Sequence, residues 1–93
     1  MKSYESMFLI KPDLGKDDLD KVLNQIQELI VKHKGSVDKV NDLGKKKTAY
    51  PVKKFQEGFY YLINMTIEQE EISKLKRGFG LNESILRVLV TAI

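Results

Sequence analysis

The stretch GFYYLINMTI, residues 58–67, decides the fold because two sets of side chains alternate along it. The larger apolar set is Phe59, Tyr61, Ile63, Met65 and Ile67, and the opposite set is Tyr60, Leu62, Asn64 and Thr66. A period of two predicts a β-strand, with successive side chains on opposite faces of a sheet. We therefore expect helices to cover the larger apolar set and to leave the other face open.

The sequence around this strand predicts three further strands and two helices. Apolar spacing predicts strands over residues 2–10, 36–50, 58–67 and 84–92, helices over 16–34 and 69–79, and a basic connection over 51–57. Gly44 predicts a bulge or bend in the second strand, and Gly35 a stop for the first helix.

The order β-α-β-β-α-β is typical of an α+β, ferredoxin-like domain. Such a domain has a four-stranded antiparallel sheet with two helices on one face, and its first and third strands lie in the centre. We expect residues 1–93 to form a single domain of this kind.

The excess positive charge is concentrated in one segment. The net charge is +3, and six lysines against three acids in residues 35–58 account for all of it. Lys45, Lys46, Lys47, Lys53 and Lys54 lie within ten residues, with no acid among them. A local basic surplus indicates a polyanion-binding surface, and the alternative is a hairpin kept soluble by its lysines.

The open face of the predicted sheet carries an apolar patch. Side-chain parity places Met7 and Leu9 of the first strand beside Tyr60 and Leu62 of the third, with nothing from this chain above them. An uncovered patch of this kind indicates a protein partner, and the alternative is a strand that is merely hydrophobic. A register slip of one residue would invert this assignment.

Catalytic and membrane functions find no support in the sequence. There is no cysteine, and His33 is the only histidine, which we expect to be a solvated or helix-capping residue. Neither of the phosphate-binding glycine motifs GxxxxGK[ST] and GxGxxG occurs. No apolar run reaches the ~18 residues of a membrane span. We expect a cytoplasmic, non-enzymatic protein without cofactor, metal, small-molecule substrate or membrane contact.

The third strand also matches part of an RNA-recognition-motif pattern, in which bases stack on sheet aromatics. Gly58, Phe59, Tyr61 and Leu62 fit the pattern, whereas Tyr60 stands where a small residue belongs. Stacking by this route would need Phe59 and Tyr61 on the open face, against the parity above.

The whole chain resembles the family of bacterial small-subunit ribosomal protein number six. The resemblance is carried by Tyr4-Glu5, Lys11-Pro12, Leu43-Gly44 with the lysine run, Ala49-Tyr50-Pro51, Lys54, Gly58 and the segment with Asn82, Ile85, Arg87 and Val88. It implies a structural constituent of the small ribosomal subunit that binds the central domain of its ribosomal RNA together with ribosomal protein eighteen. One departure is that the basic run contains only lysine, where family members often carry arginine with its bidentate fork.

The resemblance also implies which residues contact each partner. The RNA-facing set would be Lys2, Tyr4, Lys45, Lys46, Lys47, Lys53, Lys54 and Arg87. The protein-facing set, which rests on parity, would be Met7, Leu9, Tyr60 and Leu62. Two alternatives stay open, namely a single-strand RNA binder of the RNA-recognition-motif type and a protein–protein module that needs no RNA.

Overall fold

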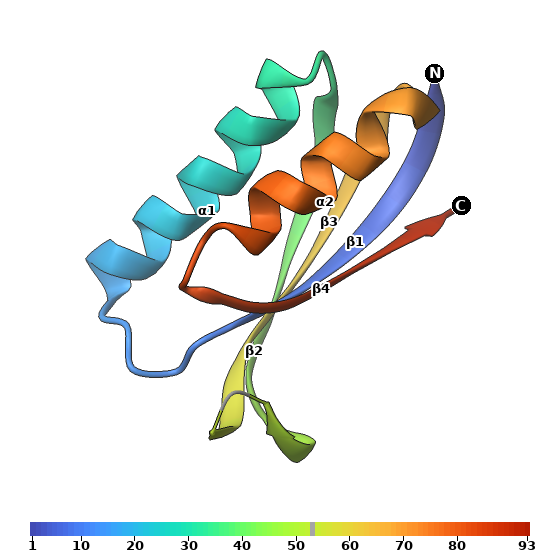
Figure 1. Cartoon of the computed structure of the whole chain (residues 1–93). Coiled ribbons are helices and arrows are strands. Elements are labelled where there is room, and N and C mark those ends of the chain that lie inside the picture. Colours follow the sequence, from blue (N-terminus) through green and yellow to red (C-terminus); the bar gives the residue numbers. More distant parts are fainter. Residues whose placement is uncertain (53) are drawn as a thin grey trace.

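The structure, a computed structural model, contains the four strands and two helices that the spacing of apolar residues predicts (Figure 1). It describes residues 1–52 and 54–93, and the description omits the side chains of residues 49–52. The elements are β1 (Lys2–Ile10), α1 (Lys16–Lys32), β2 (Ser36–Val52), β3 (Phe55–Ile67), the 3₁₀ turn η1 (Gln69–Glu71), α2 (Ile72–Gly80) and β4 (Ile85–Ala92). The predicted ferredoxin-like order is confirmed.

The strands form one antiparallel sheet with the order β2-β3-β1-β4. As predicted, β1 and β3 lie in the centre. Figure 1 shows both helices on the same face of this sheet. The opposite face is not covered by any described part of the chain.

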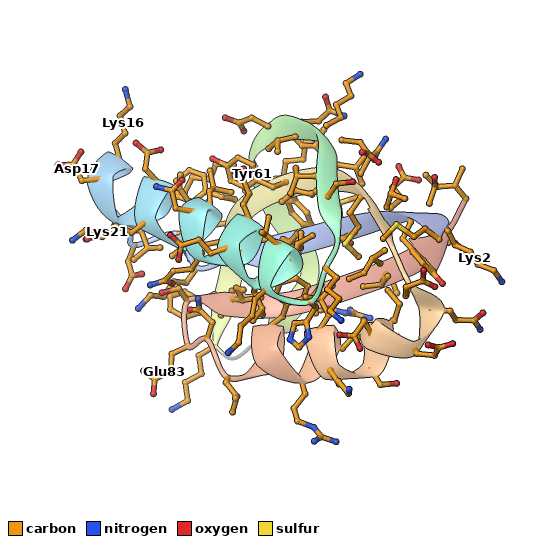
Figure 2. All side chains as sticks on the ribbon, turned by 90° about the horizontal axis from the view of Figure 1, so that it is seen from above. Lys2, Lys16, Asp17, Lys21, Tyr61 and Glu83 are labelled. Carbon is orange, nitrogen blue, oxygen red and sulfur yellow. The ribbon has the colours of Figure 1, made fainter. Side chains whose placement is uncertain are left out.

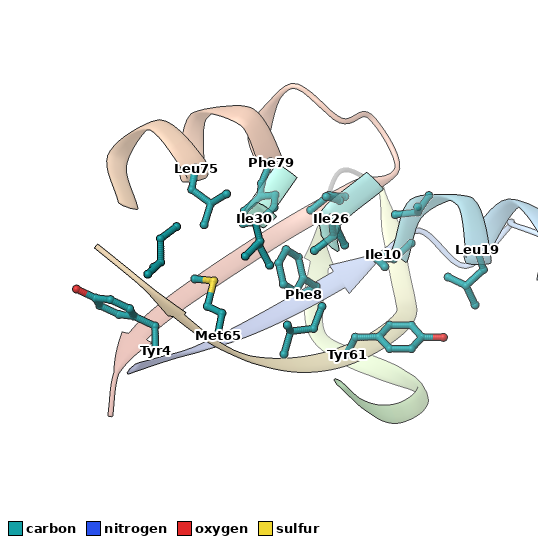
Figure 3. Close-up of a cluster of buried hydrophobic side chains, with 14 residues drawn as sticks. Tyr4, Phe8, Ile10, Leu19, Ile26, Ile30, Tyr61, Met65, Leu75 and Phe79 are labelled. Carbon is teal, nitrogen blue, oxygen red and sulfur yellow. The ribbon is translucent and has the colours of Figure 1, made fainter. Parts of the chain in front are cut away.

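The core lies between the helices and the larger apolar set of β3. Tyr61, Ile63 and Met65 are at most 5% exposed, whereas Tyr60 and Leu62 are only half-buried, which confirms the predicted parity. Helix α2 contributes Phe79, whose ring meets Phe8 of β1 edge-on at 4.9 Å between centroids (Figure 3). Removing this apolar surface from water is the main stabilising term of the fold.

The predicted connection over residues 51–57 is wrong, because the strands continue through most of it. Strand β2 runs to Val52 and β3 begins at Phe55, and these two residues pair across the turn. Lys54 closes the turn with a positive φ of 74°. Strand β1 pairs with β3 only as far as Phe59, so the rest of the hairpin is a two-stranded extension.

The helix ends also differ from prediction. Helix α1 ends at Lys32, two residues early, and the left-handed residue that follows it is Lys34, with a φ of 66°, rather than Gly35. The amide of Gly35 then donates to the carbonyl of Ile30 at 2.9 Å and satisfies a helix-end acceptor.

Candidate RNA and protein interface

The hairpin beyond the central sheet forms the candidate RNA-binding element. We call its two paired segments, residues 45–52 and 55–58, together with Lys54, the basic arm. Figure 1 shows this arm projecting beyond the helices, at the end of the molecule away from both termini. Lys45, Lys46, Lys47 and Lys54 are all exposed on it, while Lys53 lies outside the described residues.

The predicted irregularity at Gly44 is a β-bulge that sets the orientation of the arm. The pairing of β2 with β3 shifts between Asp42 and Gly44. Gly44 has a φ of +82°, a conformation that favours glycine, and its amide donates to Oδ1 of Asp42 at 2.8 Å. After this bulge Lys45 pairs with Phe59, Lys46 with Gly58 and Lys47 with Glu57.

The lysines of the arm point to opposite sides because successive side chains alternate. Phe59 packs against the core beneath the helices, so its partner Lys45 lies on the helix side of the arm, as does Lys47. Lys46 lies on the side of the open face. The Nζ of Lys45 lies 3.4 Å from Oε1 of Glu57 and 5.7 Å from the ring centroid of Phe59.

Lys2, Arg87 and Tyr4 were also predicted to face RNA, but they lie outside the basic arm. Lys2 pairs with Ile67, at the far end of β3, so about 26 Å of strand separates it from the pair of Lys45 and Phe59. Figure 2 shows Lys2 projecting from the end of the molecule opposite Lys16. Arg87 is exposed on β4, where it pairs with Leu9 on the open face.

Tyr4 is a core residue, and its assignment to the RNA-facing surface is not supported by its position. Its side chain is 7% exposed and belongs to the buried cluster, at the end of that cluster in Figure 3. Alternation along β1 puts Tyr4 on the same face as Ser6, Phe8 and Ile10, which are all buried beneath the helices.

The open face carries the predicted apolar patch, with one member the sequence analysis missed. Met7 pairs with Leu62 on one side and with Leu89 of β4 on the other, and these three line a shallow hollow of about 190 Å³ together with Glu5 and Thr91. Leu89 is 59% exposed. Alternation along β4 could have found it, because Val88 and Val90 on either side of it pack against the core.

Leu9 lies on this face but is only 4% exposed. Its side chain lies over Gly58, where an added Cβ would come within 2.5 Å of the Leu9 Cδ1 atom. The missing side chain of Gly58 therefore lets Leu9 lie flat against the sheet. We define the open-face patch by its partly exposed members, which are Met7, Tyr60, Leu62 and Leu89.

The stacking geometry of an RNA-recognition motif is absent, because Phe59 and Tyr61 face the helices. Tyr61 is 5% exposed, and its burial raises the pKa of its hydroxyl, which the carboxylates of Asp42 and Asp20 raise further. The helix side therefore carries acidic groups near the base of the arm. Tyr60 is the one aromatic of β3 that faces the open side.

His33 is the C-cap residue of α1, which is one of the two roles expected of it, and its side chain also links α1 to η1. Its Nδ1 lies 3.3 Å from Oε1 of Glu71, and both side chains are about four-fifths buried. The hydrogen bond with His33 lowers the pKa of Glu71, and Lys74 adds to that effect. We assign this pair a structural role.

The arrangement of strands, arm and patch extends over almost the whole chain, and so does its match to a protein family. The family model described as ribosomal protein S6 matches residues 3–92. The chain belongs to the ribosomal protein S6 family. It is thus a non-enzymatic component of the small ribosomal subunit.

Similar proteins agree with this membership. Small ribosomal subunit protein bS6 of Dictyoglomus turgidum is 38% identical over 93 residues, covering 100% of this chain and 96% of that protein. The bS6 protein of Geotalea daltonii is also 38% identical, over 94% of this chain and 68% of its own length. The crystal structure of 30S ribosomal protein S6 from Thermotoga maritima superposes with a TM-score of 0.92 at 29% identity, covering 99% of this chain and 87% of that one.

A structural, non-catalytic role follows from membership in the S6 family. No helix within the described residues is long and apolar enough to cross a membrane. What the site offers is a cationic arm beside an apolar face, which suits binding rather than chemistry.

Proposed function

We propose that this S6-family chain binds ribosomal RNA of the small subunit through the basic arm and ribosomal protein eighteen through the open-face patch. The observation that carries the proposal is the adjacency of the two surfaces. The arm continues β2 and β3 beyond the point where β1 ends, and Tyr60 of the patch lies two residues from Gly58 of the arm. A single complex could therefore cover both.

The arm suits phosphate rather than base recognition. Lysine ammonium groups are strongly hydrated point charges that neutralise phosphates and release counterions. The logarithm of affinity then falls with the logarithm of salt concentration, with a slope of about −0.9 for each phosphate that is neutralised. Phosphate contacts of this kind position the protein, and base contacts add sequence preference.

The patch suits a protein partner because three of its four members have aliphatic side chains. Leu89, Met7 and Leu62 line the hollow together with Glu5 and Thr91, and Tyr60 lies toward the arm. Toward the other end the face becomes polar, where Thr66 donates to Oδ2 of Asp38 at 2.6 Å. The apolar area is thus limited to the half of the sheet nearest the arm.

Binding to a central-domain fragment of small-subunit ribosomal RNA, with and without ribosomal protein eighteen, tests the proposal. The triple variant of Lys45, Lys46 and Lys47 to alanine should lose affinity and salt dependence. A matched triple variant of Lys16, Lys21 and Lys32, all exposed on α1, removes the same charge and should bind like the wild type. Equal losses in both triples would show that only net charge matters and would refute the arm as the RNA site.

A further inference from the structure

The three consecutive lysines of the arm are not equivalent, because the strand sends them to two sides with different surroundings. Lys45 and Lys47 lie on the helix side, and Lys46 lies on the open-face side. Between Gly44 and Tyr60 the sequence has one acid, Glu57, and its pairing with Lys47 places it on the helix side.

On the helix side, two neighbouring side chains hold Lys45 in place. Glu57 and the Phe59 ring both engage the ammonium of Lys45, at 3.4 Å and 5.7 Å. Asp42 pairs with Tyr61 on the same side, so Asp42 and Glu57 together offset the charges of Lys45 and Lys47 there.

The open-face side has the opposite character. Lys46 is exposed and has no ion-pair partner among the described residues. Its neighbour across the ladder is Gly58, which has no side chain and therefore places no acid opposite the lysine. Arg87 is exposed on the same face, one strand beyond Leu9.

We propose that Lys45 is a positioning residue that neutralises Glu57 on the helix side of the arm, and that RNA phosphate binds on the open-face side, at Lys46. The proposal rests on the proposed RNA binding and adds which side of the arm the RNA occupies. Asp42 and Glu57 then leave the helix side without a positive surplus, and Lys45 prevents the charge of Glu57 from reaching the bound strand.

The salt dependence of binding to the central-domain RNA fragment, in the presence of ribosomal protein eighteen, separates the two roles. Lys46→Ala should weaken binding about tenfold and reduce the magnitude of the salt slope by about 0.9, because a phosphate contact is lost. Lys45→Ala should weaken binding only a few-fold and leave the slope unchanged. The control Lys21→Ala, on α1, should change neither quantity.

Removing the acid provides the second test. Glu57→Gln in the Lys45→Ala background should restore wild-type affinity and keep the wild-type slope, because no acid is left to neutralise. A reduction of the slope by about 0.9 in both Lys45→Ala and the double variant would identify Lys45 as a phosphate ligand and overturn the proposal. Thermal unfolding of each variant checks that the arm still folds.

The failure of this inference is distinguishable from failure of the proposed function. If the wild type binds the ribosomal RNA fragment and Lys45→Ala costs as much slope as Lys46→Ala, only the two-sided arm is refuted. If the wild type does not bind that fragment, the proposed RNA function fails first and the inference fails with it.

Discussion

Replacing Gly58 by alanine should destabilise the protein, because β1 and β3 approach each other closely at that residue. An ideal Cβ on Gly58 would lie 2.7 Å from the carbonyl oxygen of Ile10 and 2.5 Å from Cδ1 of Leu9. The leucine can change rotamer, but the carbonyl belongs to the backbone of a central strand. Inserting a methyl group into such a packed site costs about 1–3 kcal/mol of unfolding free energy.

Urea denaturation measures this cost, and Gly80→Ala is the matched control. Gly80 ends α2 and has no atom within 4 Å of an added Cβ. Its replacement should be neutral or stabilise by up to about 1 kcal/mol, since alanine has less backbone freedom to lose and favours helix. If Gly58→Ala also stays within about 0.5 kcal/mol of the wild type, the close approach does not constrain the strand and the reasoning is refuted.

A double variant divides the cost between the two contacts. With Leu9→Ala as the background, the side-chain clash is gone and only the Ile10 carbonyl remains. A penalty for Gly58→Ala that persists in this background belongs to the backbone, whereas one that disappears belongs to Leu9. We expect most of it to persist.

Three further predictions concern the patch, the turn and the helix pair. Leu89→Asp should weaken binding of ribosomal protein eighteen at least tenfold with little loss of stability. The control Leu81→Asp changes an even more exposed leucine on the helix side and should leave this binding unchanged. Equal losses of binding in both variants would count against the patch. Lys54→Gly should raise the unfolding free energy by up to about 1 kcal/mol in urea titrations, because its φ of 74° suits glycine, and a loss of stability would contradict the turn geometry. Because the pKa of Glu71 is lowered, its contact with His33 stabilises the fold fully above the ordinary glutamate pKa of 4.5 and progressively less as pH falls below that value. Glu71→Gln should therefore flatten the acid limb of a curve of unfolding free energy against pH. An unchanged acid limb would exclude this pair as its source.

The sequence predicted the faces of the central strands because both follow a strict period of two. Tyr61, Ile63 and Met65 are buried as expected, and Met7 and Leu62 lie on the open face. This success comes from alternation alone, which is the strongest local signal a half-covered sheet provides.

Two predicted contact residues, Leu9 and Tyr4, are buried for different reasons. Leu9 lies on the predicted face but is buried, since its exposure depends on the absence of a side chain on Gly58, a residue 49 positions away in the chain. Tyr4 was assigned to RNA through resemblance, although alternation along β1 puts it on the buried face. The residue pattern was the better guide to position in that case.

The orientation of the lysines was the least predictable feature, because it depends on how many bulges precede them in β2. Val37 and Val40 are three residues apart yet pair with Met65 and Ile63 on the same face, which requires the register shift between Val37 and Lys39. The second shift, at Gly44, restores the original parity, so Lys45 returns to the side of Val37.

With one bulge instead of two, Lys46 would face the helices, and Lys45 and Lys47 would face the open side. Asp42 and Gly44 are therefore as important to the binding surface as the lysines, although neither contributes a positive charge. The hydrogen bond from the Gly44 amide to Asp42 fixes the second bulge, and that bulge determines which lysine shares a side with the open-face patch. A basic run read from sequence gives the amount of charge on such an arm, and the backbone irregularities before it determine where that charge points.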